Sequence, residues 1–413
     1  MKPIFDKIKK VSLDNLVYIS WGIYILTCFL NIVGIIVLSD RTQNVLKIVR
    51  YVCYIIFAFK IFHDWKNGEK ITVSIVLTGA LTIAIAIFAK NRSVFFIWFI
   101  LLALRKMEFD RLIQIAFKIF TIAFLVIICL ATLGIIPNWE FSRGNSIRYA
   151  LGFIYATDAI GMYLIIILMF FYTKREKSTK TELLILETIN VFMYSYTNGR
   201  VSFILISLVL FIQFLSRFEW IKNIFYCKIV QNCLKIICHT LPIVLFIGLH
   251  LLIVMYANNS FVANKVNKLL SNRIRLTYQA YRNYDVKPFG SNIKWQGWGG
   301  YGYKELDEGE VFQYNFVDSS YAIMIFDYGV VFSSIIILGY RKIMIDNFNR
   351  KNYWLVISIM FILVWSFIEQ HIINLGKNVF VLAFMPLLEM GEIEKLSFNE
   401  ISKVINKNRC QDN

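Results

Sequence analysis

The stretch from Asn258 to Asp318 holds most of the residues of this chain that could bind a polar ligand. It mixes Lys and Arg with Trp, Tyr and Gly. Guanidinium groups bind phosphate oxygens, aromatic faces stack on sugar rings, and glycine lets a ligand approach the backbone closely. This composition predicts a surface loop that holds an anionic, sugar-bearing ligand.

Arg200 is the first candidate for binding the anion. It follows Asn198-Gly199, a strong turn dipeptide, and begins an apolar run that is expected to be helical. A cation beside the positive end of a helix dipole is unfavourable unless an anion lies there too. The alternative is that Arg200 extends to a phospholipid head group.

Arg273 is the second candidate, within a helix expected over about residues 265–284. At 100° per residue it projects away from Arg275 and Arg282, onto an otherwise small and apolar face. We therefore expect a ligand-binding role for Arg273. Arg275 and Arg282 are expected on a stripe that faces solvent or lipid head groups.

Four side chains are candidates for moving a proton. His371 and Glu369 lie two residues apart near the end of the chain, and His371 could instead cap a turn. Asp318 precedes two serines and could cap a helix or act in catalysis. Asp158 lies ten residues after Arg148, about 15 Å further along a helix. A carboxylate at that depth in a membrane faces a wet cavity or a structural partner, such as a nearby arginine.

The aromatic residues of the same loop leave two interpretations open. Trp295, Trp298 and Tyr301 lie in a glycine-rich run that is unsuited to a helix. They could stack on sugars as part of a substrate site, or they could enter the membrane interface.

The elements that position these side chains are membrane-spanning helices. Hydrophobic residues make up 58% of the 413 and charged residues only 17%, which excludes an ordinary soluble enzyme. The hydropathy pattern predicts an all-α, polytopic bundle of about twelve spans, at roughly residues 16–38, 44–62, 71–89, 92–105, 112–136, 149–173, 182–197, 200–216, 236–257, 319–340, 353–370 and 372–390.

Positive charge predicts how this bundle is oriented. With both termini in the cytoplasm, the inner segments carry 26 of the Lys and Arg residues and the short outer loops carry seven. The predicted organisation is therefore nine spans in 1–257, a large extracellular loop in 258–318, three spans in 319–390 and a cytoplasmic tail in 391–413. The net charge of +17 belongs mostly to these loops, so it does not indicate nucleic-acid binding.

The cysteines indicate neither disulfides nor a metal site. None of the seven lies in the large loop, and the spacing of Cys227, Cys233 and Cys238 matches no zinc pattern. No Asp-x-Asp pair or His/Cys cluster occurs on the predicted outer side. We expect no metal and no cofactor.

Four local segments resemble the Wzy-like polysaccharide polymerases and O-antigen ligases of bacterial envelopes. RYALGFIYATDAIG is similar to the family's segment at the start of a span, with Arg148 at its head and Tyr155-Ala156-Thr157 where relatives often have His-Pro-Asn. YTNGRVSF resembles its arginine turn at Arg200. LLSNRIRLTYQAYRNYDVKPFG followed by VDSSYAIMIFDYG resembles its large-loop signature, with Arg273, Gly290 and Asp318. EQHIINLGKN is similar to a motif before the last span.

The resemblance implies an inverting glycosyltransferase in the bacterial cytoplasmic membrane. Such enzymes transfer a growing glycan from undecaprenyl diphosphate to the next lipid-linked repeat unit, without metal or nucleotide. Arg200 and Arg273 would stabilise the departing diphosphate. Membrane lipids, a flippase and a chain-length regulator are the expected partners. The alternatives are a ligase that uses another acceptor and, from a different class, a lipid-linked oligosaccharide flippase or other transporter, which would show an internal repeat and broken helices.

Overall fold

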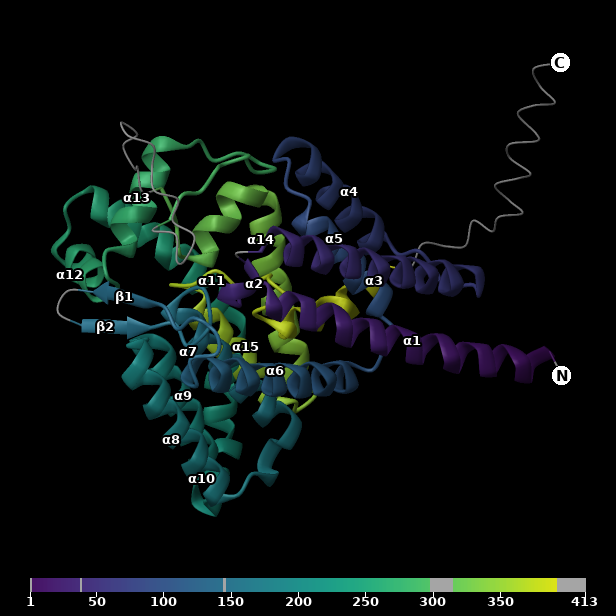
Figure 1. The fold of residues 1–413 in the computed structure, drawn as a ribbon, viewed down its shortest axis with the longest axis horizontal. Helices are drawn as coiled ribbons and strands as arrows, with labels where there is room; N and C mark the ends of the chain where they lie inside the picture. The colour runs from purple at the N-terminus through teal and green to yellow at the C-terminus, as the bar shows by residue number, and fades with distance from the viewer. Residues whose placement is uncertain (1, 38, 144–145, 298–314, 392–413) are drawn as a thin grey trace.

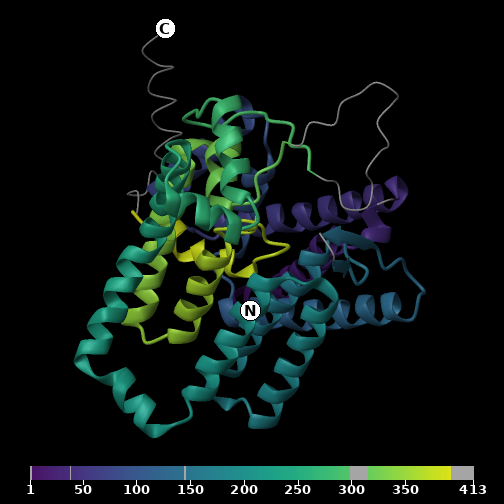
Figure 2. The ribbon, with the colours of Figure 1, turned by 90° about the vertical axis from the view of Figure 1, so that its left-hand side faces the viewer.

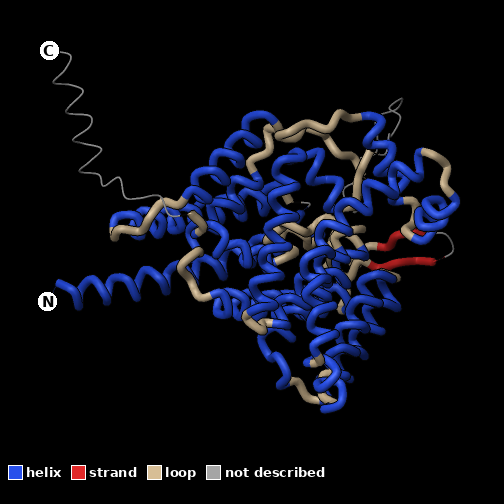
Figure 3. Tube along the Cα trace, turned by 180° about the vertical axis from the view of Figure 1, so that it is seen from behind, coloured by secondary structure: helices blue, strands red, loops and turns tan. Residues whose placement is uncertain are grey.

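The computed structural model describes residues 2–37, 39–143, 146–297 and 315–391. Most of this part of the chain is helical, with one pair of short strands (Figures 1 and 3). The α-helices are α1 (Lys2–Leu30), α2 (Gly34–Val37), α3 (Asp40–Lys66), α4 (Val73–Phe88), α5 (Ser93–Leu104), α6 (Phe109–Thr132), α7 (Ala156–Lys174), α8 (Lys180–Thr197), α9 (Arg200–Leu215), α10 (Glu219–Tyr226), α11 (Lys228–Ala257), α12 (Phe261–Leu269), α13 (Arg273–Asn283), α14 (Ser320–Asn349) and α15 (Tyr353–Trp365). The strands are β1 (Glu140–Arg143) and β2 (Ser146–Tyr149), and η1 (Arg175–Lys177) and η2 (Val379–Glu389) are 3-10 helices.

Several of these helices are long and apolar enough to cross a membrane. Among the described residues five qualify by length and composition, and α9 with α10 makes a sixth if this pair, bent by 99°, is one span. Shorter apolar helices are α4, α5, α15 and η2. The chain is therefore a helical membrane protein, as its hydropathy indicates.

Helix α7 lies at the centre of the bundle. It packs against α6, α8, α9 and α15. Of its most apolar 18-residue stretch 83% is buried, compared with 22% of the corresponding stretch of α11. Its sequence is apolar on every side, which is the pattern of a helix surrounded by protein. Gly161 lets Trp365 of α15 approach, because a Cβ there would lie 2.8 Å from the indole ring.

The sixth predicted span, 149–173, becomes helical later than predicted, and a hairpin precedes it. Strands β1 and β2 pair antiparallel, with Glu140 opposite Tyr149 and Phe141 opposite Arg148. Helix α7 begins only at Ala156, so Arg148 is in a strand and Asp158 is in the first helical turn. The prediction that a helix carries Asp158 about 15 Å below Arg148 was wrong, because the backbone of this segment pairs across a hairpin.

The helix expected over residues 265–284 is two helices, α12 and α13. Between them Ser271 and Asn272 have φ of 56° and 67°, the left-handed conformation that ends a helix. This break makes Arg273 the first residue of α13. Helical periodicity in the sequence did not reveal the break, since the apolar pattern continues across it.

Helix α14 is interrupted at Gly329, and loop backbone occupies the gap. Gly329 has φ of 87°, and Gly290 of the facing loop has φ of 80°. The N–H of Ser291 donates to the carbonyl of Phe326, while the N–H of Val330 donates to the carbonyl of Lys287. A Cβ on Gly290 would lie 2.4 Å from the carbonyl oxygen of Asp327, so glycine is required at this crossing.

The last predicted span, 372–390, is not an α-helix. After α15 the chain continues through an irregular segment, residues 366–378, before η2 begins at Val379. Pro386 lies inside η2 and removes a backbone donor there. The irregular segment lies beside the N-terminal end of α14, since the N–H of Ser320 donates to the carbonyl of Ser366.

Candidate functional site: an arginine-lined cavity

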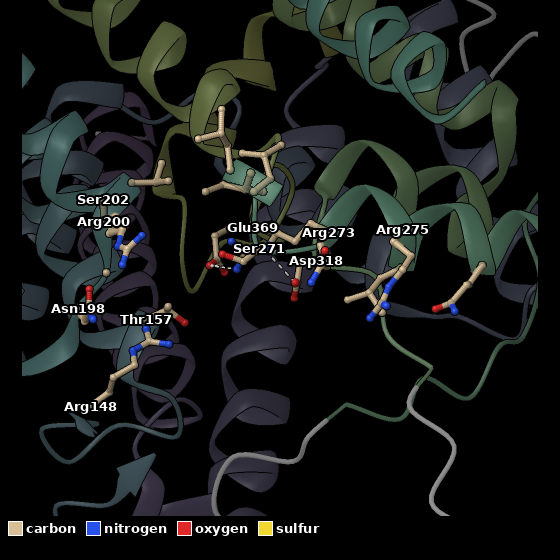
Figure 4. A pocket seen from close by; sticks show the side chains of 18 residues that line it. Arg148, Thr157, Asn198, Arg200, Ser202, Ser271, Arg273, Arg275, Asp318 and Glu369 are labelled. Atoms are coloured by element: carbon tan, nitrogen blue, oxygen red, sulfur yellow. Dashed lines mark hydrogen bonds and ion pairs between the residues drawn. The ribbon is translucent and has the colours of Figure 1, made fainter. Parts of the chain in front are cut away.

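A cavity of about 540 Å³ brings together segments from five parts of the chain. Four arginines and two carboxylates line it, together with polar and apolar neighbours: Arg148, Thr157, Asn198, Gly199, Arg200, Val201, Ser202, Leu269, Leu270, Ser271, Asn272, Arg273, Arg275, Leu276, Gln279, Asp318, Ile368 and Glu369. Figure 4 shows Arg148 and Arg200 on one side, Arg275 on the other, and Arg273 with Glu369 and Asp318 between them.

Arg200 enters the cavity at the start of α9. Asn198 ends α8 with φ of 48°, and Gly199 follows as the N-cap. A Cβ on Gly199 would lie 2.5 Å from the side chain of Ile160, so this turn packs directly on α7. No side chain caps α9, and no described carboxylate pairs with the exposed guanidinium of Arg200.

Arg273 enters the cavity at the start of α13, and two carboxylates hold it. Its Nε donates to Asp318 Oδ2 at 2.8 Å, and its Nη2 donates to Glu369 Oε1 at 3.1 Å. These three side chains are 24%, 23% and 21% exposed. The start of α13 is also capped, because Asn267 Oδ1 accepts the N–H of Arg275 at 2.9 Å. The orientation of this guanidinium is therefore fixed before any ligand binds.

Asp318 and Glu369 are the two predicted proton-moving residues that line the cavity. Ser319 is the N-cap of α14 and makes no side-chain cap, so the capping role expected for Asp318 was wrong. Burial raises the pKa of the Glu369 carboxyl to about 7, although Arg273 lowers it. A carboxyl group that titrates near neutral pH has the range that suits a general base.

Asp158 is buried beside the cavity instead of lining it. Lys377 Nζ lies 2.6 Å from its Oδ1, so its partner is a lysine and not one of the arginines. Burial alone would lower the pKa of Lys377, but Asp158, and after it Glu369, hold that pKa above its usual value.

Arg148 reaches the cavity from β2, and its Nε donates to the carbonyl of Thr197 at 2.7 Å. This bond links the hairpin to the α8–α9 turn.

His371 is enclosed by protein and does not line the cavity. Its ring stacks on Trp365, with the ring centroids 3.3 Å apart, and the backbone N–H of His371 donates to Ser320 Oγ at 2.9 Å. Burial, together with the charge of Lys377, keeps the pKa of the imidazole well below its usual value. The ring supports the segment that carries Glu369, and it has no direct path to a ligand in the cavity.

Of the predicted aromatic residues, Trp295 lies within the described part of the chain, and it does not line the cavity. Trp295 donates its indole N–H to Asp327 Oδ1 at 2.8 Å and packs edge-on against Tyr284 and Phe326. Its position is that of a packing residue over the break in α14. Trp298 and Tyr301 lie outside the described residues.

Two residues that line the cavity, and the lysine that pairs with Asp158 beside it, were not predicted from the sequence. Arg275 lines it although it was expected on a solvated stripe, because the helix break at Asn272 turns the first residues of α13 towards α9. Gln279 lines it one turn further along α13. Lys377 pairs with Asp158, and no local signal in the sequence links these two residues, which are 219 positions apart.

Among the described residues, no three His, Cys, Asp or Glu side chains gather closely enough to hold a metal ion. Searches of protein-family models, of curated proteins and of solved structures found no match to this chain. The cavity itself is therefore the basis for a functional proposal.

Proposed function

We propose that this protein is a membrane glycosyltransferase that polymerises lipid-diphosphate-linked oligosaccharide repeat units, as expected of a member of the Wzy-like family. The donor is a glycan on undecaprenyl diphosphate, and the acceptor is a hydroxyl of the next lipid-linked repeat unit. The products would be chains of a capsular or exopolysaccharide, formed at the outer face of the bacterial cytoplasmic membrane.

The observation that carries the proposal is that Arg200 and Arg273 line one cavity. They are far apart in the sequence, yet each is the first residue of a helix, α9 or α13. Helix N-termini favour anions through their backbone N–H groups and the helix dipole. Two helix N-termini and two arginines match a diphosphate, because they supply positive charge and paired N–H donors for its oxygens.

The proposed chemistry assigns separate roles to the two kinds of side chain. The acceptor oxygen attacks the anomeric carbon, the bond from this carbon to the diphosphate oxygen breaks, and the lipid diphosphate leaves with the bonding electrons. Arg200 and Arg273 stabilise the negative charge that grows on the leaving group. The carboxylate of Glu369 accepts the proton of the acceptor hydroxyl, and Asp318 holds Arg273 in place.

The proposal places about twelve spans in the membrane, with both termini in the cytoplasm and residues 258–318 outside the cell. The arrangement in Figure 1 is consistent with this, because the hairpin, α12 and α13 lie on the side of the molecule away from the N-terminus. The partners are undecaprenyl-diphosphate-linked oligosaccharides and membrane lipids, together with a flippase and a chain-length regulator.

The test is polymerisation by the purified protein in vesicles supplied with lipid-linked repeat units. We expect Arg200→Ala and Arg273→Ala to leave single lipid-linked units unused. Arg282→Ala is the matched control, since Arg282 is on α13 but does not line this cavity. Unchanged polymer length in both cavity variants would rule out the proposal.

The product distinguishes the alternatives. Transfer of a whole glycan to an acceptor other than a lipid-linked unit would indicate a ligase. Movement of the lipid-linked unit between leaflets with no new glycosidic bond would indicate a transporter.

A further inference from the structure

The helix α12 has its apolar side chains on the outside. Phe261, Val262 and Leu269 are 79%, 53% and 76% exposed, while Ala263 and Asn267 are buried. At 100° per residue the three exposed residues fall on one face of the helix. A short helix that buries an asparagine and exposes a phenylalanine is arranged for an apolar environment outside the protein.

The asparagine is buried because it connects α12 to α13. Asn267 Nδ2 donates to Asn272 Oδ1 at 3.0 Å, and its own Oδ1 accepts the N–H of Arg275. These bonds fix how α12 is rotated about its axis. The exposure of Phe261 and Leu269 is therefore a property of the folded chain and not of a loosely attached segment.

The position of α12 indicates what covers this face. It begins four residues after α11 ends at Ala257, and α11 is a 30-residue apolar helix that is mostly exposed. At 1.5 Å per residue α11 is about 45 Å long, close to the thickness of a bilayer with its head groups. Helix α10, which has no buried residue, flanks the other end (Figure 2). A helix that starts where such a span ends lies at the membrane surface.

We propose that α12 lies in the head-group layer of the membrane, with Phe261, Val262 and Leu269 among the acyl chains, and that it forms the lipid entrance of the arginine-lined cavity. At 100° per residue Lys265 projects from this face between Phe261 and Leu269, and Lys268 projects from its edge beside Phe261; both are exposed. Lysines in this position extend to phosphate head groups.

The connection to the cavity is direct. Leu269 and Leu270 at the end of α12 line the same cavity as Arg200 and Arg273. An isoprenoid chain could pass along these leucines while its diphosphate stays near the arginines. This second step rests on the proposed function, whereas the contact between α12 and the membrane does not.

The experiment uses the full-length protein in vesicles of phosphatidylethanolamine and radiolabelled phosphatidylglycerol. Phe261 or Leu269 is replaced by the photo-cross-linker p-benzoylphenylalanine. Ile247, exposed on α11, is the positive control, and Asn283, exposed at the end of α13, is the negative control. We expect Phe261 and Leu269 to become labelled about as strongly as Ile247 and several-fold more than Asn283. Unchanged thermal unfolding identifies the variants that have folded.

Labelling at the level of Asn283, or a cross-link to a second copy of the chain, would overturn the membrane contact. If such a protein still polymerises repeat units, the proposed function stands without it. A second arm adds radiolabelled undecaprenyl diphosphate, which is expected to label the Leu269 position. Labelling of that position by phospholipid alone would overturn the entrance.

Discussion

The two arginine-bearing walls of the cavity are built in opposite ways. On the α9 wall, Arg200 is exposed, no described carboxylate pairs with it, and its helix has no side-chain cap. On the α13 wall, Arg273 is held by Asp318 and Glu369, and Asn267 caps its helix. Arg200 leaves its charge to be met by a ligand, while the charge of Arg273 is met within the protein.

This difference separates binding from stability. Arg200 lies beside the positive end of α9, where its charge destabilises the empty protein and an incoming anion removes the penalty. Arg273 contributes to the fold as well, because its removal leaves two partly buried carboxylates close together. The variants below test this contrast, starting with the one expected to change both activity and stability.

Arg273→Ala should reduce both activity and stability. We expect polymerisation to fall by about 100-fold or more, as when a preorganised donor to a developing anion is lost. The free energy of unfolding should fall by about 2 kcal/mol, because Asp318 and Glu369 lose their shared partner. Polymer assays and thermal unfolding of the purified protein measure the two effects.

The double variant Arg273→Ala with Glu369→Gln sharpens this prediction. Removing one of the two carboxylate charges should restore part of the lost stability without restoring activity. A melting temperature that does not change in Arg273→Ala would mean that the salt bridges contribute nothing to the fold.

Glu369→Gln should abolish most of the activity and change its pH dependence. Loss of a general base costs roughly 10²–10⁴-fold. Because the pKa of Glu369 is raised to about 7, the rate of the unaltered protein should fall as pH drops through 7 and the carboxylate becomes protonated. Arg273, Asp318, Lys377 and Asp158 all act on this titration. This fall in rate at low pH, the acidic limb of the pH–rate profile, should be absent from Glu369→Gln. The profile of Glu369→Asp should keep an acidic limb.

If the acidic limb persists in Glu369→Gln, the base is a different group. Asp318→Asn is the matched comparison, because Asp318 bonds the same arginine. It should lower the rate and keep an acidic limb, shifted to lower pH because the charge of Asp318 raises the pKa of Glu369.

Arg200→Ala should reduce activity by about 100-fold and leave the fold intact. Its exposed guanidinium makes no ion pair with a described residue, so the melting temperature should stay the same or rise. Arg200→Lys keeps the charge but not the bidentate geometry and should recover part of the rate. Added inorganic pyrophosphate should raise the melting temperature of the unaltered protein more than that of Arg200→Ala. A large loss of stability in Arg200→Ala would remove the contrast between the two walls.

Trp295→Phe should have the smallest effect, and on stability only. It removes the hydrogen bond to Asp327, at a cost of about 1 kcal/mol, and keeps most of the aromatic packing. Polymer length should not change, because the indole is engaged away from the arginine-lined cavity. Reduced polymerisation with unchanged thermal unfolding would favour the alternative that Trp295 stacks on a sugar.

The sequence by itself was enough to locate most of the helices. Every predicted span except the last contains an α-helix, although the first is broken between α1 and α2 and the sixth becomes helical only at Ala156. Long apolar runs form helices wherever backbone groups must be satisfied internally. The Asn198-Gly199 turn and the position of Arg200 at the start of α9 were also predicted, since turn dipeptides act over a few residues. These features depend on neighbours in the chain.

The partners of the charged residues were decided only by the tertiary structure. Asp318 was expected to cap its own helix, but it bonds Arg273, which is 45 residues away. Glu369 meets the same arginine across 96 residues, and His371 is buried against Trp365 instead of facing the cavity. The sequence shows which groups can carry charge, whereas the packing of distant helices determines which charges are desolvated together. For that reason it is the packing that gives Arg273 its partners and leaves Arg200 exposed for an anion.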